Sequence, residues 1–459
     1  MSRIHISSYD DPVIINIFNL LGYTIVLFHV MLADPSAYDL PVILWWWRNV
    51  YPHEDSSSLK YIDCGEYSKC LSASDRSYLD DSRTKGIIFY GTRVKPYDLP
   101  LPRKSEHTWN LIHEESPMNN YLLSHVEFIE LFNFTATFRR ESDYPLTTQN
   151  IYSMGYLTDR NPVPIREKNR KIKENGYAPV LYVQSHADVA SDRDTYVQEL
   201  MKYIKVDSYG KCLHNKDLPE SMKKADDSYE DEIFLDFISY YKFHISFENA
   251  ICRDYMTEKL MRALHLGSVP VYMGSPDVRD WEPNNRSIIL AQDFDSPGEL
   301  AKYLQFLNEN DKEYEKFLGH KKSGGITNSF LKINLQERSW HTHPSGSSER
   351  NDFNIFVGFE CFVCEKLHQH YLDYKLGGDN FSKITFSHRA NDSHMGCPEP
   401  QKVSLSNSES SGGSTDFVWT RTYHQQKVIA TAARHMVESG ETQSNMFSEF
   451  NPIYGPRRH

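Results

Sequence analysis

Continuous apolar runs, separated by segments able to form helices, are the feature of this sequence that most limits its fold. The run LPVILWWW at 40–47 has no charged side chain, which is typical of a strand buried on both faces of a parallel sheet. Three further strand candidates follow, GIIFYGT at 86–92, TWNLIHEESP at 108–117 and LFNFTATF at 131–138. We therefore predict βαβ units and an α/β fold.

The alternation begins again after the polar segment RKIKENG at 170–176. APVLYVQS, KVDSYG, KFHISF, SVPVYMG and RSIILAQDFD are strand candidates, with helix candidates among them. Two consecutive doubly wound, Rossmann-like domains facing a cleft are the most economical interpretation. The predicted boundaries are 37–176 for the first domain, 177–345 for the second, 346–400 for a cysteine-containing segment and 401–459 for a disordered, low-complexity tail with one short helix at 425–438.

The N-terminal run at 13–33 is mostly apolar and long enough to span a bilayer. We predict that residues 1–36 form a signal-anchor or a signal peptide, with a buried strand and helix as the alternative. The net charge of −12 disfavours nucleic acid or an anionic membrane surface as a partner. Membrane contact is therefore expected only through this segment.

The seven cysteines allow two interpretations. In an oxidising compartment, which we favour, Cys64 with Cys70 and Cys361 with Cys364 would form disulfide loops. In the cytosol the pairs would suggest zinc, although the first spacing is too long for a zinc knuckle. Cys252 is either bridged or buried. Four Asn-x-Ser/Thr sequons are candidate N-glycosylation sites, at Asn133, Asn285, Asn380 and Asn391.

The stretch from Tyr240 to Gly274 places many polar groups at the start of one predicted helix. Asp254 is the predicted N-cap, so Glu258 and Lys259 would lie in the first turn. That end has free N–H groups and faces the carboxyl edge of the predicted sheet, a place that attracts a diphosphate. Lys259 would add a positive charge, and Glu258 would accept bonds from sugar hydroxyls. The alternative is a capped helix with a surface Glu–Lys pair.

The motif FEN…DYMTEKL…GSVPVYMG resembles the donor-binding signature of the α1,3-fucosyltransferases of glycosyltransferase family 10. The resemblance extends over about 40–400, and FYGT, HEESP, FNFTATFRRESDYPLT, DRDTYVQEL and VDSYGKC are most similar to the α-(1,3)-fucosyltransferase 10 and 11 branch. It implies a GT-B fold, with an N-terminal acceptor-binding domain and a C-terminal GDP-fucose-binding domain. It also implies inverting, single-displacement transfer without a cofactor or an essential metal.

The resemblance also assigns roles to single residues. Glu115, in HEESP, matches the family's catalytic glutamate, which would deprotonate the acceptor hydroxyl. Arg193 matches the arginine that contacts the donor diphosphate, a contact that suits a planar guanidinium. Ser185 is a further candidate beside the nucleotide. The donor contacts that carry over from the signature itself are Glu248, Asn249, Tyr255, Glu258 and Lys259.

Two Asp-x-Asp motifs, at 192–194 and 293–295, match the pattern that holds Mn²⁺ in metal-dependent glycosyltransferases. After the second motif, Ser296, Pro297 and Glu299 supply an N-cap, a first-turn proline and a capping-box acid. A helix start accounts for these residues without a metal, so we expect no metal site.

We therefore expect a fucosyltransferase that moves fucose from GDP-fucose to a glycoprotein, either to GlcNAc of an N-glycan or to Ser/Thr of a folded domain. Its expected location is the lumen of the secretory pathway, as a single-pass type II protein of the Golgi membrane or in the endoplasmic reticulum. Only residues 34–40 separate the apolar run from the first strand, whereas family members have a longer stem. The alternatives are a catalytically silent sugar-nucleotide or glycoprotein binding protein on the same fold and a cytosolic zinc-binding scaffold.

Overall fold

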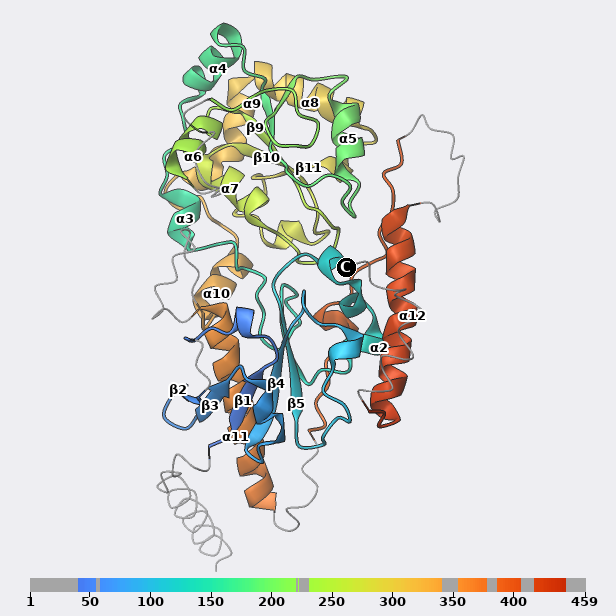
Figure 1. The fold of residues 1–459 in the computed structure, drawn as a ribbon. Helices are drawn as coiled ribbons and strands as arrows, with labels where there is room; N and C mark the ends of the chain where they lie inside the picture. Colours follow the sequence, from blue (N-terminus) through green and yellow to red (C-terminus); the bar gives the residue numbers. More distant parts are fainter. Residues whose placement is uncertain are drawn as a thin grey trace, which may run out of the picture.

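The computed structural model describes residues 40–54, 58–219, 222, 231–340, 354–377, 386–405 and 417–442. These residues form two α/β units, one above the other in Figure 1, each built around its own sheet. The predicted α/β class is therefore confirmed. The apolar run at 13–33 and the sequon at Asn380 lie outside the described residues. Within the described part, no helix combines the length and the apolar character needed to cross a bilayer.

The first unit contains a six-stranded sheet in the order β2-β3-β1-β4-β5-β6. All neighbouring strands are parallel except β2 and β3, which are antiparallel. Each of the four strand candidates predicted in the first half of the sequence contributes one strand. The bounds are β1 Val42–Trp45, β2 Lys60–Asp63, β3 Lys69–Ala73, β4 Thr84–Tyr90, β5 Thr108–His113 and β6 Phe134–Thr137.

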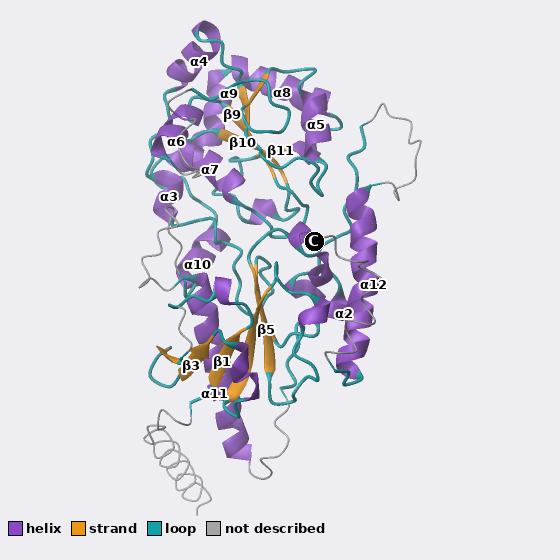
Figure 2. Ribbon diagram, viewed as in Figure 1, coloured by secondary structure: helices purple, strands orange, loops and turns teal. Residues whose placement is uncertain are grey.

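Helices cover both faces of this sheet (Figure 2), and the colours of Figure 1 show that two of them, α11 and α12, come from the C-terminal part of the chain. Side chains alternate across a strand, so Ile43 packs on one face with α11 while Val42 packs on the other with α2 and α12. The short helix predicted at 425–438 is confirmed as part of α12, which begins earlier, at residue 418, while the predicted disorder is wrong for this stretch, because Ile429 and Ala433 are buried in the first core. The bounds are α2 Val126–Ile129, α11 Ile355–Gly377 and α12 Val418–Glu438.

The second unit contains a five-stranded sheet, all parallel, in the order β11-β10-β9-β7-β8. Its strands are β7 Val180–Tyr182, β8 Val206–Ser208, β9 Phe243–Phe247, β10 Val269–Met273 and β11 Ile289–Leu290. Its helices are α3 Met154–Thr158, α4 Ile165–Glu174, α5 Arg193–Leu200, α6 Glu232–Ile238, α7 Glu258–Leu266, α8 Pro297–Glu309, α9 Asp311–Glu315 and α10 Ser329–Glu337.

Residues 151–174 pack on the second unit, although the sequence predicted a boundary at 176. Leu157 of α3 lies in one apolar cluster with Leu260 of α7. On α4, the buried Nζ of Lys168 donates hydrogen bonds to the carbonyl oxygens of Tyr241 and Gly267. The polar sequence of this segment suggested a connection between domains, because the buried residue of α4 is a lysine and therefore adds no apolar pattern to the sequence.

The disulfides join distant parts of the chain rather than neighbouring cysteines, so the predicted local loops are wrong. Cys64 and Cys70, on either side of the β2–β3 turn, pair with cysteines of α11 that lie one turn apart. Cys252 is bridged to Cys397. His368 lies close to the sulfurs of the Cys70 bridge, but these are joined to each other, so no thiolate is present for the predicted zinc alternative. The bridges are Cys64–Cys361, Cys70–Cys364 and Cys252–Cys397.

The sequons differ in accessibility. Asn133 is 1% exposed, and its side chain accepts a hydrogen bond from the backbone N–H of Trp109 and donates one to the carbonyl of His388. Asn133 is therefore dropped as a candidate glycosylation site, because its amide is a buried structural group. Asn285 and Asn391 are exposed and remain candidates.

Disulfide mapping under non-reducing conditions checks the pairing. Cleavage after Lys69 and after Phe362 separates the members of each neighbouring cysteine pair. Peptides that join neighbouring cysteines of either pair would contradict the structure. The expected cross-linked peptides join Cys64 to Cys361, Cys70 to Cys364 and Cys252 to Cys397.

Candidate active site

The carboxyl ends of the parallel strands of the two sheets meet, and the contact falls on two of the predicted motifs. Ser116, which follows β5 in HEESP, donates a 2.7 Å hydrogen bond to Oδ1 of Asn249. Asn249 follows β9 in the FEN turn, which we define as residues 247–249. The hydroxyl of Tyr255 donates to the same oxygen at 3.1 Å. Asn249 is thus fixed from both units, which places HEESP against the donor signature.

Glu115 lies one residue before this contact. Its Oε2 accepts hydrogen bonds from Thr92 Oγ1 at 2.7 Å and from Asn119 Nδ2 at 2.6 Å. Partial burial raises the pKa of Glu115, but the hydrogen bonds outweigh burial, and the pKa lies below its ordinary value. Glu115 is therefore an ionised, oriented carboxylate at neutral pH.

Glu114 has a different environment. Its Oε1 accepts a 2.9 Å hydrogen bond from the hydroxyl of Tyr90, while its Oε2 is buried without a partner among the described residues. Burial raises the pKa of Glu114 to about 7. Two adjacent carboxyls therefore titrate in different ranges, a separation typical of acid–base sites.

Helix α7 begins later than the sequence predicted. Its N-cap is Thr257, not Asp254, which has a left-handed backbone with φ 61° and lies outside the helix. Glu248 is fully buried and accepts hydrogen bonds from the N–H and the hydroxyl of Thr257, both at 2.7 Å. The structure thus places Glu248 beneath the helix start as a supporting residue, rather than on a surface that a donor would touch.

The first turn of α7 presents charged side chains as predicted. Lys259 Nζ lies 3.0 Å from Glu258 Oε1 and 3.7 Å from Glu248 Oε2. Burial raises the pKa of Glu258, but the cations Lys259 and Arg262 overcome it and lower the pKa to about 2. Glu258 is ionised and its side chain is 41% exposed, so it is available to a ligand.

Arg193, the first residue of α5, is 1% exposed. It donates to the carbonyl oxygens of Phe247, at 2.9 Å, and His186, at 3.1 Å, which places it behind the FEN turn. Among the described residues, its Nε has no hydrogen-bond partner and no carboxylate forms an ion pair with Arg193. The alternative of a surface arginine paired with Asp192 or Asp194 is therefore wrong.

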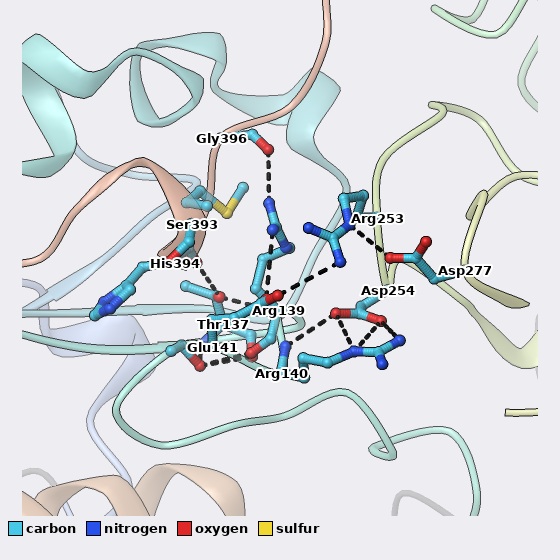
Figure 3. A network of polar contacts seen from close by, with 12 residues as sticks. Thr137, Arg139, Arg140, Glu141, Arg253, Asp254, Asp277, Ser393, His394 and Gly396 are labelled. Carbon is cyan, nitrogen blue, oxygen red and sulfur yellow. Dashed lines mark hydrogen bonds and ion pairs between the residues drawn. The ribbon is translucent and has the colours of Figure 1, made fainter. Parts of the chain in front are cut away.

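A polar network fixes the two units relative to each other (Figure 3). The guanidinium of Arg140, just beyond β6, binds Asp254 through Nε and Nη2, the shortest contact being 2.6 Å. Asp254 is fully buried and also accepts a hydrogen bond from Trp281. The neighbouring Arg253 pairs with the partly exposed Asp277 at 2.6 Å.

Comparison with known proteins decides the family. Residues 38–148 match "Fucosyltransferase, N-terminal" and residues 173–379 match "Glycosyltransferase family 10 (fucosyltransferase) C-term". The chain is 41% identical over 407 residues to "GDP-fucose protein O-fucosyltransferase 3" of Gallus gallus, covering 88% of this chain and 82% of the relative. The Homo sapiens relative of that name is 42% identical, covering 88% and 81%. This chain belongs to glycosyltransferase family 10.

The family assignment confirms the predicted resemblance and makes the chain a fucosyltransferase. A search of solved structures finds a crystal structure of an α1,3-fucosyltransferase with GDP-fucose, 14% identical, with a TM-score of 0.40. That match covers 77% of this chain and 93% of the solved one.

The predicted catalytic and donor-binding residues of this fucosyltransferase lie around the FEN turn, with the exception of Ser185. Glu115 approaches the turn from the first sheet, while Arg193 and Lys259 approach it from the second. Ser185 follows β7, is partly exposed and is next in sequence to His186, whose carbonyl binds Arg193. Sequence reasoning missed Arg140 because its partner, Asp254, was taken for a helix cap.

The Asp-x-Asp motifs are engaged in protein contacts. Asp192 accepts hydrogen bonds from Thr195 and from the backbone N–H of Val403, while Asp293 pairs with Arg279. Ser296 is the N-cap of α8, with proline at the first position, as predicted.

Replacing Arg140 by Gln should lower the free energy of unfolding by about 3–5 kcal/mol, because Asp254 would remain as a buried, unpaired carboxylate. Arg253→Gln is the matched control, since it breaks a partly exposed ion pair in the same network and should cost about 0–1 kcal/mol. Denaturant unfolding of the fucosyltransferase measures both. Equal losses would show that the Arg140 pair has no special role in joining the units.

Proposed function

We propose that this fucosyltransferase transfers fucose from GDP-fucose to a Ser or Thr hydroxyl of a folded protein domain, with inversion at the anomeric carbon. The name shared by the relatives at 41–42% identity supports a protein acceptor and an O-linked product. The observation that carries the proposal is the Ser116–Asn249 hydrogen bond, which brings the carboxylate of HEESP to the donor signature from the opposite sheet.

The donor diphosphate would bind between the FEN turn and the start of α7. Lys259 supplies a cation with a side chain 15% exposed, and the N-terminus of α7 adds partial positive charge. Arg193 supplies a second cation that lacks a carboxylate partner among the described residues. These charges would stabilise the leaving diphosphate, so we propose that the reaction needs neither a metal nor a cofactor.

Glu115 would act as the general base. It takes the proton of the acceptor hydroxyl while that oxygen attacks C1 of fucose, and the bond from C1 to the phosphate oxygen breaks as GDP leaves. Thr92 and Asn119 hold the carboxylate ionised and oriented.

We also propose the lumen of the secretory pathway as the location of this fucosyltransferase, since three disulfides among the described residues suit an oxidising compartment.

Labelled GDP-fucose, offered with folded cysteine-rich protein domains and with N-glycans in separate reactions containing EDTA, tests the function. We expect label on the protein domains, in a bond that survives removal of N-glycans. Glu115→Gln should lower the rate by about 10²–10⁴-fold while GDP affinity stays the same. Transfer to glycans alone would refute the Ser/Thr acceptor. Dependence on a divalent cation would refute the proposal that the reaction needs no metal.

Lys259→Ala should weaken GDP-fucose binding by about 1–3 kcal/mol, the scale of a hydrogen bond to a charged group. Lys302→Ala is the control, because Lys302 lies on α8 of the same unit with a side chain 73% exposed and pairs with Glu299 of the same helix. Calorimetry measures both affinities, and thermal unfolding verifies that the variants are folded. Wild-type affinity in Lys259→Ala would remove Lys259 from the donor site.

A further inference from the structure

Residues 183–192 form a loop that connects β7 to α5 and leads to Arg193, the proposed contact to the donor diphosphate. Two residues of this loop, Asp188 and Asp192, have left-handed backbones, with φ 55° and 50°. This conformation is unfavourable for a residue other than glycine and persists only where the surrounding structure holds it. The side chains of 186–188 are exposed. The loop therefore depends on contacts from other parts of the chain.

The position of Arg193 depends on this loop as well as on the second sheet. Its Nη1 donates to the carbonyl oxygen of Phe247 at 2.9 Å, and its Nη2 donates to that of His186 at 3.1 Å. Phe247 is a fully buried residue of β9, whereas His186 lies in the exposed part of the loop. The sheet therefore fixes one acceptor of the guanidinium, and the conformation of the loop fixes the other.

Contacts that hold the loop come from the C-terminal part of the chain. The indole N–H of Trp419, in the first turn of α12, donates to the carbonyl oxygen of Asp188 at 2.7 Å. The backbone N–H of Val403 donates to Oδ2 of Asp192 at 2.9 Å. Both left-handed residues thus accept a hydrogen bond from the segment beyond 386, which lies outside the residues that match the two family models.

Trp419 is itself held by the first unit. Its ring packs edge-on against Tyr121, with the ring centroids 6.2 Å apart, and Tyr121 is 3% exposed. Tyr121 shares an apolar cluster with Ala190 of the loop and with Ala250, and the ring of Trp419 packs against this cluster. In Figure 1, α12 runs along the first unit and its start points toward the second. The indole N–H therefore reaches the loop from a fixed position.

We propose that Trp419 is a positioning residue of the donor site, which holds the loop 183–192 so that Arg193 can bind the donor diphosphate. Trp419 acts through the loop and not by contact with the donor. Without the indole N–H, the loop would adopt other conformations for part of the time, and His186 would then no longer accept from Arg193. Donor affinity falls with the fraction of molecules that keep the competent loop. The inference rests on the proposed function, in which Arg193 binds the diphosphate.

Trp419→Phe tests this role, because phenylalanine keeps a ring in the apolar cluster and removes the N–H donor. We expect the Kd for GDP, measured by calorimetry on the full chain, to rise roughly 3–10-fold, the scale of one hydrogen bond between neutral groups. The amides of Ser191 and Asp192, bonded to the carbonyls of Asn249 and Val189, should exchange hydrogen faster. An unchanged Kd would overturn the proposal, and so would a raised Kd with unchanged exchange.

Tyr423→Phe is the matched control. Tyr423 lies one turn further along α12 and packs against the same apolar cluster, but its hydroxyl donates to the carbonyl oxygen of Cys397, at 3.0 Å, and not to the loop. GDP affinity should stay at the wild-type value in this variant. An equal loss in Tyr423→Phe and Trp419→Phe would show that the effect comes from the packing of α12 in general, which would overturn the positioning role.

Combination with Arg193→Gln shows whether Trp419 acts through Arg193. In the Arg193→Gln background, Trp419→Phe should weaken GDP binding by less than about twofold further. A further loss as large as in the wild-type background would overturn the proposal. Thermal unfolding verifies that each variant is folded.

Failure of the proposed function gives a different result. In that case Arg193→Gln alone would bind GDP as tightly as the wild type, so Arg193 would not contact the diphosphate, and the positioning role would fall with it. Weaker binding in Arg193→Gln together with wild-type binding in Trp419→Phe refutes the positioning role alone.

Discussion

The buried ion pair between Arg140 and Asp254 is the contact on which the geometry of the site depends. Asp254 has no exposed surface, and a buried carboxylate is tolerable only when its partners fit closely. Its backbone lies in the left-handed region, a conformation that costs of order 1–3 kcal/mol for a residue other than glycine. The pair therefore holds the chain in a shape that it would not adopt alone. Tyr255 is the next residue, and its hydroxyl donates a hydrogen bond to Asn249. The backbone conformation at Asp254 therefore helps to position Asn249.

The C-terminal part of the chain completes the first unit and ties it to the second. Helix α11 is bonded to the β2–β3 hairpin by two disulfides, and α12 buries its apolar face on the opposite side of the sheet. The segment 386–405 reaches the second unit through the Cys252–Cys397 bridge. Trp419 of α12 then donates to the carbonyl of Asp188, in the loop that leads to Arg193.

This arrangement has a consequence for folding. The strands of the first sheet are made early in synthesis, but two of the helices that cover it, α11 and α12, come from residues beyond 354. Contacts of such high sequence separation slow folding, because loop closure must precede the gain from burial. The order of synthesis therefore leaves the apolar strands of the first unit without α11 and α12 until late in synthesis.

The sequence correctly predicted the structural features that depend on local pattern. It missed the contacts that depend on residues distant in the sequence. The apolar runs identified the strands, and Ser296 identified the start of α8. Asp254 looked like a cap because nothing nearby reveals that Arg140 lies against it. The cysteine spacings suggested local loops because the hairpin and α11 are brought together only by the fold. Asn133 carries a sequon, yet burial makes its amide structural.

The two cations of the site, Lys259 and Arg193, differ in the protein groups that contact them. Lys259 is held by Glu258 and Glu248, so a bound diphosphate would compete with carboxylates for the ammonium. Arg193 is buried against backbone carbonyls, and its charge has no carboxylate partner in the described part of the chain. A desolvated charge of this kind costs free energy that an anion would recover. Under the proposed function, the donor diphosphate would supply the negative charge that Arg193 lacks. Nucleotide binding should therefore stabilise the folded protein against unfolding.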